Sequence, residues 1–304
     1  MTSPSPPPRP GRLAVGVIGV GRVGSVLGAA LVRAGHEVVA ACAVSAASRR
    51  RAAELLPGTP LLPADEVVAR STLVLLAVPD ESLAPLVEGL AQTDAFAAPG
   101  QLVAHTSGRH GVAVLEPAVR RGALPIAVHP AMTFLGSSVD LQRLTGCAFG
   151  VTAPEPLVLV AEALVIEMGG EPVRIAEEDR ALYHAALAAG SNHLVTLVAE
   201  TADLLRVAGV AEPARMLGPL LGAALDNALR SGDAALTGPV ARGDAAGVAA
   251  HLAELRRAAP AGVPAYVALA RLTADRALAA GRLEPAAAAT LLGVLATPSD
   301  GARA

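Results

Sequence analysis

Lysine and tryptophan are absent from the 304-residue chain, and other aromatic residues are scarce. All 24 basic residues are arginine, so every mechanism that needs a lysine proton donor is excluded. Three phenylalanines and two tyrosines are too few for a platform on which nucleic-acid bases stack. The net charge of −3 provides no basic field for nucleic acid or an acidic membrane surface. We therefore expect neither of them as a partner.

Cysteine and long apolar runs are also sparse. Cys42 and Cys147 lie in strand-like segments, where we expect small buried side chains rather than a disulfide or a metal site, as in a cytoplasmic protein. Charged or histidine residues interrupt the alanine-rich runs well short of about 18 apolar residues, so no membrane span is expected. The proline-rich residues 1–11 lack the apolar core of a signal peptide and predict a disordered leader.

A glycine-rich stretch near the start of the chain carries the strongest functional signal. An apolar run is followed by an amphipathic helix that ends at Gly35. The first motif glycine permits a tight turn, the second a close approach to a pyrophosphate, and the third tight packing of the helix. The N-terminus of the following helix attracts the negatively charged pyrophosphate through its free N–H groups and the helix dipole. The pattern predicts a dinucleotide site, with an ordinary tight turn as the alternative. The predicted contacts are Gly19, Val20, Gly21, Arg22, Val23 and Gly24.

The residues after the second predicted strand (36–44) bear on the choice of cofactor. NAD sites usually place an acidic residue about 20 residues beyond the glycine loop, where it binds the ribose hydroxyls. Here no acid follows Val44, and Ser45, Ser48 and Arg49 come instead. Hydroxyls and a guanidinium suit a 2′-phosphate. We therefore expect NADP, with NAD as the alternative cofactor and a solvated helix face as the alternative interpretation of this segment.

Strand and helix signals alternate as far as about residue 176. This order predicts an α/β fold with a doubly wound, Rossmann-type parallel sheet. Helical periodicity dominates from residue 178 onward, and we find no convincing strand there. The predicted domains are a dinucleotide-binding domain at 12–176 and an all-α domain at 177–304 that binds substrate and forms a dimer.

Polar residues follow several of the predicted strands. Ligands of open parallel sheets bind at the carboxyl ends of the strands, so these residues are expected to border one crevice. Any one of them also suits a turn or helix cap, Ser107 in particular. We expect Val78 and Pro79 at the cofactor, His105 and Thr106 at the substrate, and Ser107 and His129 in catalysis.

The helical domain adds further candidates. At 100° per residue, Arg180, His184 and Ser191 fall on one stripe of the first long helix, with Asn192 on its flank. A surface or interface histidine is the alternative interpretation. We expect His184 and Asn192 in catalysis and Ser191 at the substrate. A later loop offers Thr237, Gly238 and Arg242 as holders of a substrate carboxylate, or it is a plain connection between helices.

Four segments give the chain a recognisable pattern: His105–Gly108, His129–Phe134, Tyr183–Ala186 with Ser191-Asn192, and Leu236–Asp244. With them the chain resembles the 6-phosphogluconate-dehydrogenase-like superfamily. Within that superfamily it resembles the Rossmann-like oxidoreductases that carry the helical domain of unknown function 2520. The resemblance covers roughly residues 12–295 and implies kinship with ketopantoate reductase, pyrroline-5-carboxylate reductase, prephenate dehydrogenase and 3-hydroxyisobutyrate dehydrogenase.

One departure from these relatives concerns the proton donor. The resemblance implies a lysine that protonates or polarises the substrate oxygen in standard ketopantoate reductases and 3-hydroxyacid dehydrogenases. This chain has none, and the guanidinium of Arg180 is a poor general acid. The proton must therefore come from His184, His129, His105, Tyr183 or water.

The sequence thus predicts a cytoplasmic, NADP-dependent reductase of a small 2-oxo acid, with ketopantoate as one candidate. The alternative enzymatic hypotheses are a pyrroline-carboxylate-like imine reductase and a prephenate-like dehydrogenase. The non-enzymatic hypothesis is a module that senses NADP(H) or scaffolds a partner without catalysis. The active site is expected between the carboxyl edge of the sheet and the first long helix of the second domain. The helices of that domain have too few polar positions to solvate every face. Because exposed apolar patches usually mark interfaces, we expect a homodimer through that domain.

Overall fold

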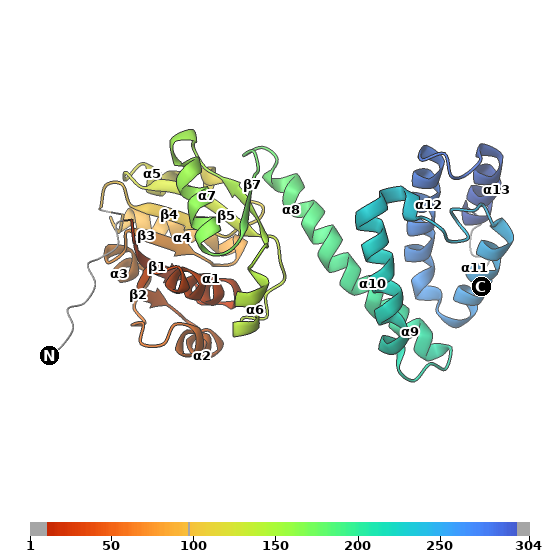
Figure 1. Cartoon of the computed structure of the whole chain (residues 1–304), viewed down its shortest axis with the longest axis horizontal. Coiled ribbons are helices and arrows are strands. Elements are labelled where there is room, and N and C mark those ends of the chain that lie inside the picture. The colour runs from red at the N-terminus through yellow and green to blue at the C-terminus, as the bar shows by residue number, and fades with distance from the viewer. Residues whose placement is uncertain (1–10, 97, 297–304) are drawn as a thin grey trace, which may run out of the picture. The chain divides into compact units, whose positions relative to one another are not determined.

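The structure is a computed structural model that describes residues 11–96 and 98–296. Apart from Gly11, the predicted leader at residues 1–11 lies outside the described residues. Two compact units divide the chain between Ser191 and Asn192 (Figure 1). Within the two described ranges, no helix is both long enough and apolar enough to cross a membrane.

Among the described residues, the first unit is built around a seven-stranded sheet in the order β2-β1-β3-β4-β5-β6-β7. Strands β1 to β5 are parallel, β6 is antiparallel to β5, and β7 is parallel to β6. The predicted Rossmann-type fold is confirmed, with its last two strands reversed. The strands are β1 (Ala14–Ile18), β2 (Glu37–Cys42), β3 (Leu73–Leu76), β4 (Leu102–His105), β5 (Leu124–Pro130), β6 (Ala148–Thr152) and β7 (Glu171–Arg174).

Helices cover both faces of this sheet, because alternate residues of each buried strand point to opposite sides. Leu73 and Leu75 of β3 pack in one core, whereas Val74 and Leu76 pack in the other. Strands covered on both faces therefore show as unbroken apolar runs in the sequence. One layer comprises α1 (Arg22–Arg33), α2 (Ala46–Leu55), α6 (Ser138–Arg143) and α7 (Val158–Glu167), and the other α3 (Ala64–Ala69), α4 (Asp80–Gln92) and α5 (Glu116–Val119).

The reversal of β6 follows from the path of the chain after β5. The Ala131 N–H donates to the Ala148 carbonyl at 2.8 Å, so the connecting segment begins and ends at one edge of the sheet. The chain therefore returns beside β5 in the opposite direction instead of crossing the sheet. The register pairs His129 with Gly150, which brings the start of β6 to the edge where β1 to β5 end.

Helix α8 (Arg180–Ala188) belongs to the first unit, whereas the predicted domain boundary at residues 176–177 precedes it. The reason is the side chain of Arg180, which is buried and bound to sheet carbonyls. A π-helical turn, Ala189–His193, follows and spans the division between the units. A π turn holds more residues than an α turn, so the predicted stripe does not extend beyond Ala188 to Ser191.

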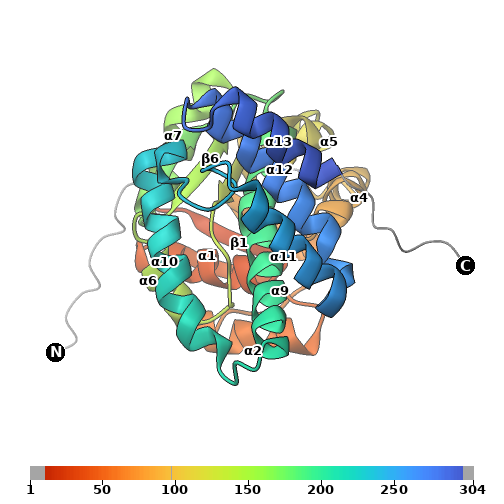
Figure 2. The ribbon, with the colours of Figure 1, turned by 90° about the vertical axis from the view of Figure 1, so that its right-hand side faces the viewer.

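The second unit is helical, and its buried core comes from its C-terminal part. Its core residues lie between Val240 and Leu295. Helix α9 has no buried residue, and α10 buries only Pro213 and Leu217. Figure 2 faces this unit and shows a short loop joining α9 to α10. The helices are α9 (Leu194–Val207), α10 (Pro213–Ser231), α11 (Ala245–Ala258), α12 (Val263–Ala279) and α13 (Pro285–Ala296).

Candidate functional site

The glycine loop between β1 and α1 has the geometry that the sequence predicts. Gly19 has a φ of +93°, and its N–H and that of Val20 both donate to the Cys42 carbonyl. A Cβ at Gly19 would lie 2.5 Å from the Ala77 carbonyl and 3.0 Å from Val78. A Cβ at Gly24 would lie 2.2 Å from the Gly19 carbonyl. These two glycines therefore allow the loop, α1 and the end of β3 to pack together.

Gly21 differs from its neighbours because nothing lies within 4 Å of the position of a Cβ there. It is also the N-cap of α1, and no side chain caps this helix end. The N–H groups of the first turn are thus free of side-chain partners and lie beside open space. This combination fits a pyrophosphate, which needs close approach to main-chain donors. The predicted neighbours Arg22 and Pro79 are exposed, and Val23 and Val78 are half-buried.

In the segment after β2, some side chains are hydrogen-bonded within the segment and others are free to bind a ligand. The Ser45 Oγ accepts the Ser48 N–H at 3.0 Å and caps α2, while the Ser48 Oγ donates to the Ser45 carbonyl at 2.8 Å. Ser48 is buried, whereas Ser45 and Arg49 are exposed. The Arg49 Nε donates to the Ala43 carbonyl at 3.3 Å, which leaves its two terminal nitrogens for a ligand. Ser45 and Arg49 are therefore better placed for a 2′-phosphate than Ser48.

The turn after β4 is held together by His105. Its Nε2 lies 2.8 Å from the Gly111 carbonyl, and its Nδ1 accepts the Ser107 N–H at 3.2 Å. Burial lowers the pKa of His105 to about 4, so the ring is neutral and Nε2 carries its proton. Both ring nitrogens are thus engaged within this turn, and the geometry favours a structural role over the predicted substrate contact. Half-buried Thr106 remains a candidate.

Ser107 keeps a proton to donate. Its Oγ accepts the His110 N–H at 3.3 Å, and the side chain is buried. Because a hydroxyl both donates and accepts, its O–H is still available to a ligand at the end of β4. This placement is compatible with the predicted catalytic role of Ser107.

Three ring side chains meet where β4 and β5 end. His129 Nδ1 lies 2.9 Å from the Tyr183 hydroxyl, and the His129 and His184 rings are edge-on with centroids 6.1 Å apart. Two glycines make room for these rings. A Cβ at Gly108 would lie 2.6 Å from His184 and 2.9 Å from the His129 Nε2, and one at Gly150 would lie 2.6 Å from the Tyr183 hydroxyl. Any larger residue at either position would displace a ring.

His129 is the group in this cluster best suited to donate a hydrogen bond to a ligand. Burial, followed by the charges of Arg180 and His184, lowers its pKa to about 4, so the imidazole is neutral at neutral pH. Its Nδ1 faces Tyr183. Within the described part of the chain, its Nε2 has no hydrogen-bond partner. Nε2 therefore offers one donor or acceptor beside Gly108.

Arg180 lies beneath the cluster and is 1% exposed. Its guanidinium donates to the Thr152 hydroxyl at 2.7 Å, to the Ala127 carbonyl at 3.1 Å and to the Gly150 carbonyl at 3.0 Å. A side chain buried this way cannot contact a substrate, although its charge acts on the rings above it. Sequence reasoning placed Arg180 on a polar stripe and missed its burial, because the carbonyls that bind it come from distant strands.

The other predicted site residues belong to the π turn and the second unit. Ser191 is half-buried, and the side chain of Asn192 is exposed. Arg242 donates to the Thr237 carbonyl, and both border a cavity of about 410 Å³ in the second unit. Gly238 lies in the same loop and borders a different, apolar cavity. Their roles at a substrate stay predictions.

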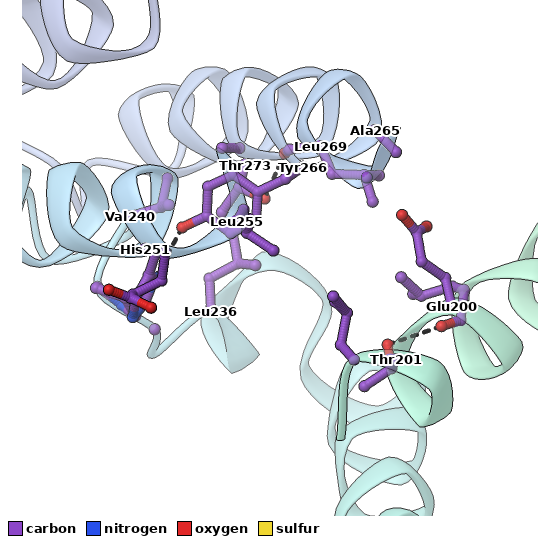
Figure 3. Close-up of a pocket in the computed structure, with 17 residues that line it drawn as sticks. Glu200, Thr201, Leu236, Val240, His251, Leu255, Ala265, Tyr266, Leu269 and Thr273 are labelled. Atoms are coloured by element: carbon purple, nitrogen blue, oxygen red, sulfur yellow. Dashed lines mark hydrogen bonds between the residues drawn. The ribbon is translucent and has the colours of Figure 1, made fainter. Parts of the chain in front are cut away.

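That apolar cavity, of about 670 Å³, separates α9 from α11 and α12 (Figure 3). Its lining includes Leu197, Leu204, Leu255 and Leu269. One polar feature of its wall is a hydrogen bond of 2.9 Å between His251 and the hydroxyl of Tyr266, whose rings are edge-on. Sequence analysis did not single out this cavity, since its walls come from residues as far apart in the chain as Leu197 and Thr273.

Comparison with known families matches both units. Residues 1–130 match the Rossmann-like domain, and residues 147–273 match the domain of unknown function 2520. The first match lies within the first unit, and the second spans the division between the two units. The resemblance drawn from the sequence is confirmed in these two domains. No curated protein matches the chain.

Solved structures share the fold of this two-domain chain. A candidate NADP oxidoreductase from Bacteroides fragilis is 22% identical with a TM-score of 0.68, covering 87% of this chain and 98% of its own. A protein from Thermotoga maritima is 20% identical with a TM-score of 0.63, and the match covers 88% of this chain and 99% of the Thermotoga chain. An imine reductase from Pseudomonas sp. is 20% identical with a TM-score of 0.62, covering 93% and 99%. At these identities the likeness shows the fold.

Proposed function

We propose that the chain is an NADP-dependent oxidoreductase that reduces a small 2-oxo acid, with ketopantoate as one candidate substrate. The observation that carries this proposal is neutral His129, whose Nε2 lacks a partner among the described residues at the end of β5. The same unit holds an open glycine loop suited to a dinucleotide. The names of two proteins with this fold, an NADP oxidoreductase candidate and an imine reductase, support reductase chemistry.

The first unit contains residues suited to the pyrophosphate and the 2′-phosphate of the cofactor. Gly21 and the N-terminus of α1 would hold the pyrophosphate, and Ser45 and Arg49 the 2′-phosphate. When bound, the reduced nicotinamide supplies a hydride. His129 Nε2–H donates a hydrogen bond, and then a proton, to the substrate oxygen as negative charge develops there. The Ser107 hydroxyl is a second donor at the same edge.

The second unit supplies the remaining groups of the proposal. Arg242, with the Thr237-Gly238 main chain, suits the substrate carboxylate, because a guanidinium binds a carboxylate in a fork. Asn192 adds a neutral donor, and His184 and Ser191 complete the set of predicted contacts. Two free thiols, Cys42 and Cys147, are compatible with the proposed cytoplasmic location.

A panel of substrates distinguishes this function from its rivals. NADPH oxidation would be followed on addition of pyruvate, ketopantoate, 1-pyrroline or, in the reverse direction with NADP, prephenate. We expect the 2-oxo acids to be reduced fastest. Preference for 1-pyrroline would favour an imine reductase, which the shared fold of the Pseudomonas enzyme makes the second candidate. NADPH binding without any turnover would indicate a sensor or scaffold instead.

Replacement of Arg49 with alanine is expected to weaken NADPH binding and leave NADH binding unchanged. The guanidinium contact with a 2′-phosphate contributes about 1.5–3 kcal/mol, or roughly 10- to 150-fold in affinity. Fluorescence titration of both cofactors measures the change. Arg33→Ala is the matched control, because Arg33 ends α1 at the opposite edge of the sheet. Equal affinity of the wild-type protein for NADPH and NADH, or tighter NADH binding, would contradict the preference for NADP.

We also propose that a second copy of the chain covers the apolar surface of the helical unit. Val195 on α9 is 67% exposed, and Leu220 and Leu229 on α10 are 64% and 80% exposed. The leucine-lined cavity beside α9 is a further apolar feature of this unit. Exposed apolar area of this extent usually marks an interface. A second copy is the favoured occupant because α9 and α10 lack a core of their own and a homodimer supplies one.

Light scattering at micromolar concentration is expected to give twice the 30.3 kDa mass of one chain. Leu220→Glu is expected to shift the mass toward the monomer, because a buried carboxylate without a partner is costly. Leu159→Glu is the matched control, since Leu159 is 74% exposed on α7 of the first unit. A monomeric wild-type protein would contradict the dimer.

A further inference from the structure

Tyr183 and Arg180 lie beside His129, although the donor role proposed above does not use them. We propose that Tyr183 fixes His129 in the tautomer with its proton on Nε2, and returns a proton to Nδ1 when Nε2 gives one to the substrate, while Arg180 stabilises the remaining phenolate. Tyr183 is thus a positioning residue that acts through His129. This inference rests on the proposed reductase function, because it concerns the proton that accompanies the hydride.

The contact between the two rings is fixed by the sheet beneath them. The Tyr183 hydroxyl lies 2.9 Å from His129 Nδ1, and the rings are perpendicular with centroids 5.6 Å apart. Gly150 pairs with His129 across β5 and β6, and a Cβ there would lie 2.6 Å from that hydroxyl. The strand register therefore places a glycine where Tyr183 needs room to reach His129.

The surroundings of Tyr183 determine which partner donates. Arg180 lies 5.8 Å from the centre of the Tyr183 ring, and a guanidinium only donates. Among the described residues, the hydrogen-bond partner of the Tyr183 hydroxyl is His129 Nδ1, at 2.9 Å. His129 Nδ1 is thus the acceptor available to the Tyr183 O–H. A neutral imidazole has one N–H, so its proton is on Nε2, beside Gly108.

Arg180 provides a buried positive charge without a counter-ion. Among the described residues, no carboxylate lies within ion-pair distance of it, and its donors bind carbonyl and hydroxyl oxygens. Glu177 is the acidic residue that acts on it, but that carboxylate binds the N–H groups of Val112 and Ala113. A buried cation of this kind stabilises an anion that forms next to it.

Several titratable groups face this pair. Arg180 of α8 and Cys147 ahead of β6 act on Tyr183. Arg180 and His184 of α8 and Asp80 at the start of α4 act on His129. Burial raises the pKa of Tyr183, while Arg180 lowers it. Tyr183 is therefore protonated at neutral pH and ready to donate.

The proton transfer balances without a further reagent. The His129 Nε2–H bond breaks as the substrate oxygen gains its proton, and the Tyr183 O–H bond breaks as Nδ1 gains one. The imidazole ends neutral with its proton on Nδ1, and the negative charge lies on Tyr183 beside Arg180. After the product leaves, water gives a proton to Nε2, Nδ1 returns its proton to the Tyr183 phenolate, and the hydroxide that remains leaves to solvent.

The absence of tryptophan allows the ionisation of Tyr183 to be measured by itself. The chain has two tyrosines, so the near-ultraviolet change on raising the pH of Tyr266→Phe reports Tyr183 alone. Adding Arg180→Gln is expected to raise its midpoint by about 1–3 pH units, the usual effect of losing a nearby opposite charge. Tyr266, measured in Tyr183→Phe, is the matched control and should not respond to Arg180→Gln, because burial alone raises its pKa. An unchanged Tyr183 midpoint would overturn the role of Arg180.

A second measurement needs no change at Arg180 and so does not depend on that variant folding. Nitrogen-15 NMR of the histidine rings separates the protonated from the unprotonated nitrogen, and His129→Gln assigns the His129 signals by their loss. We expect the proton on Nε2 in the wild-type protein and a mixture of tautomers in Tyr183→Phe. A proton on Nδ1 in the wild type, or no change in Tyr183→Phe, would overturn the proposal.

Turnover gives the third readout and separates this inference from the proposed function. With NADPH and a 2-oxo acid from the panel, Tyr183→Phe is expected to lower kcat by about 10²-fold, within the usual range for proton transfer, with little change in KM. An unchanged kcat in Tyr183→Phe would overturn the relay. If the wild-type protein reduces no substrate, the proposed function fails and with it the relay, whereas the NMR result still decides the tautomer.

Discussion

His129→Ala is expected to lower kcat/KM for the 2-oxo acid by about 10²- to 10³-fold, as the loss of one well-placed donor to a developing oxyanion does. The affinity for NADPH should change little, because the glycine loop and Arg49 do not involve His129. Asn192→Ala is expected to lower kcat/KM by a similar factor if its amide donates to the same substrate. Steady-state kinetics and NADPH fluorescence titration measure the two effects separately.

Two further variants sharpen this test. His129→Gln keeps an N–H donor on a side chain of similar reach, so it should retain more activity than His129→Ala. His193→Ala is the control, since His193 is exposed in the π turn and has no assigned role. Near-normal turnover in both His129→Ala and Asn192→Ala would mean that the chemistry takes place elsewhere in the molecule.

Alanine at two positions of the glycine loop is expected to have opposite consequences. At Gly24 the new Cβ would meet the Gly19 carbonyl at 2.2 Å, an overpacking that costs about 1–3 kcal/mol of unfolding free energy. At Gly21 the Cβ meets nothing and φ is −78°, so the stability should stay within about 0.5 kcal/mol of the wild type. The same methyl group would fill the space that a pyrophosphate needs, and NADPH affinity should fall at least about 10-fold, or 1.4 kcal/mol.

Thermal unfolding and NADPH titration of both variants separate packing from binding. For a unit of this size, each 1 kcal/mol lowers Tm by about 2–4 °C, so Gly24→Ala should melt measurably earlier. Gly21→Ala should melt with the wild type and bind NADPH weakly. Normal NADPH affinity in a stable Gly21→Ala protein would show that no pyrophosphate lies against this loop.

Local sequence patterns predict the parts of the fold that depend on neighbouring residues. The glycine loop is one of them, because Gly19, Gly21 and Gly24 act within one turn and one helix end. The buried strands are another, since β3 and β5 are short apolar runs bounded by turn residues. The helical periodicity of the second unit likewise predicts α10 to α13 to within a few residues, whereas it gives α8 and α9 as one helix that the π turn divides.

The candidate site depends on contacts that no local pattern contains. His129 and Tyr183 are 54 residues apart, and their contact needs β6 to reverse so that Gly150 lies opposite His129. Arg180 looks like a surface residue at the start of a helix, yet carbonyls from two strands bury it. The π turn after Ala188 also breaks the helical stripe on which Ser191 was predicted.

Transfer of deuterium from NADPH to the product tests the central claim most directly. The protein would be incubated with a 2-oxo acid and NADPH deuterated at nicotinamide C4, in separate samples for each face, and the 2-hydroxy acid analysed by mass spectrometry. The proposed function predicts one deuterium at the former carbonyl carbon from one labelled face and none from the other. Tight NADPH binding with no labelled 2-hydroxy acid from any member of the panel would contradict it.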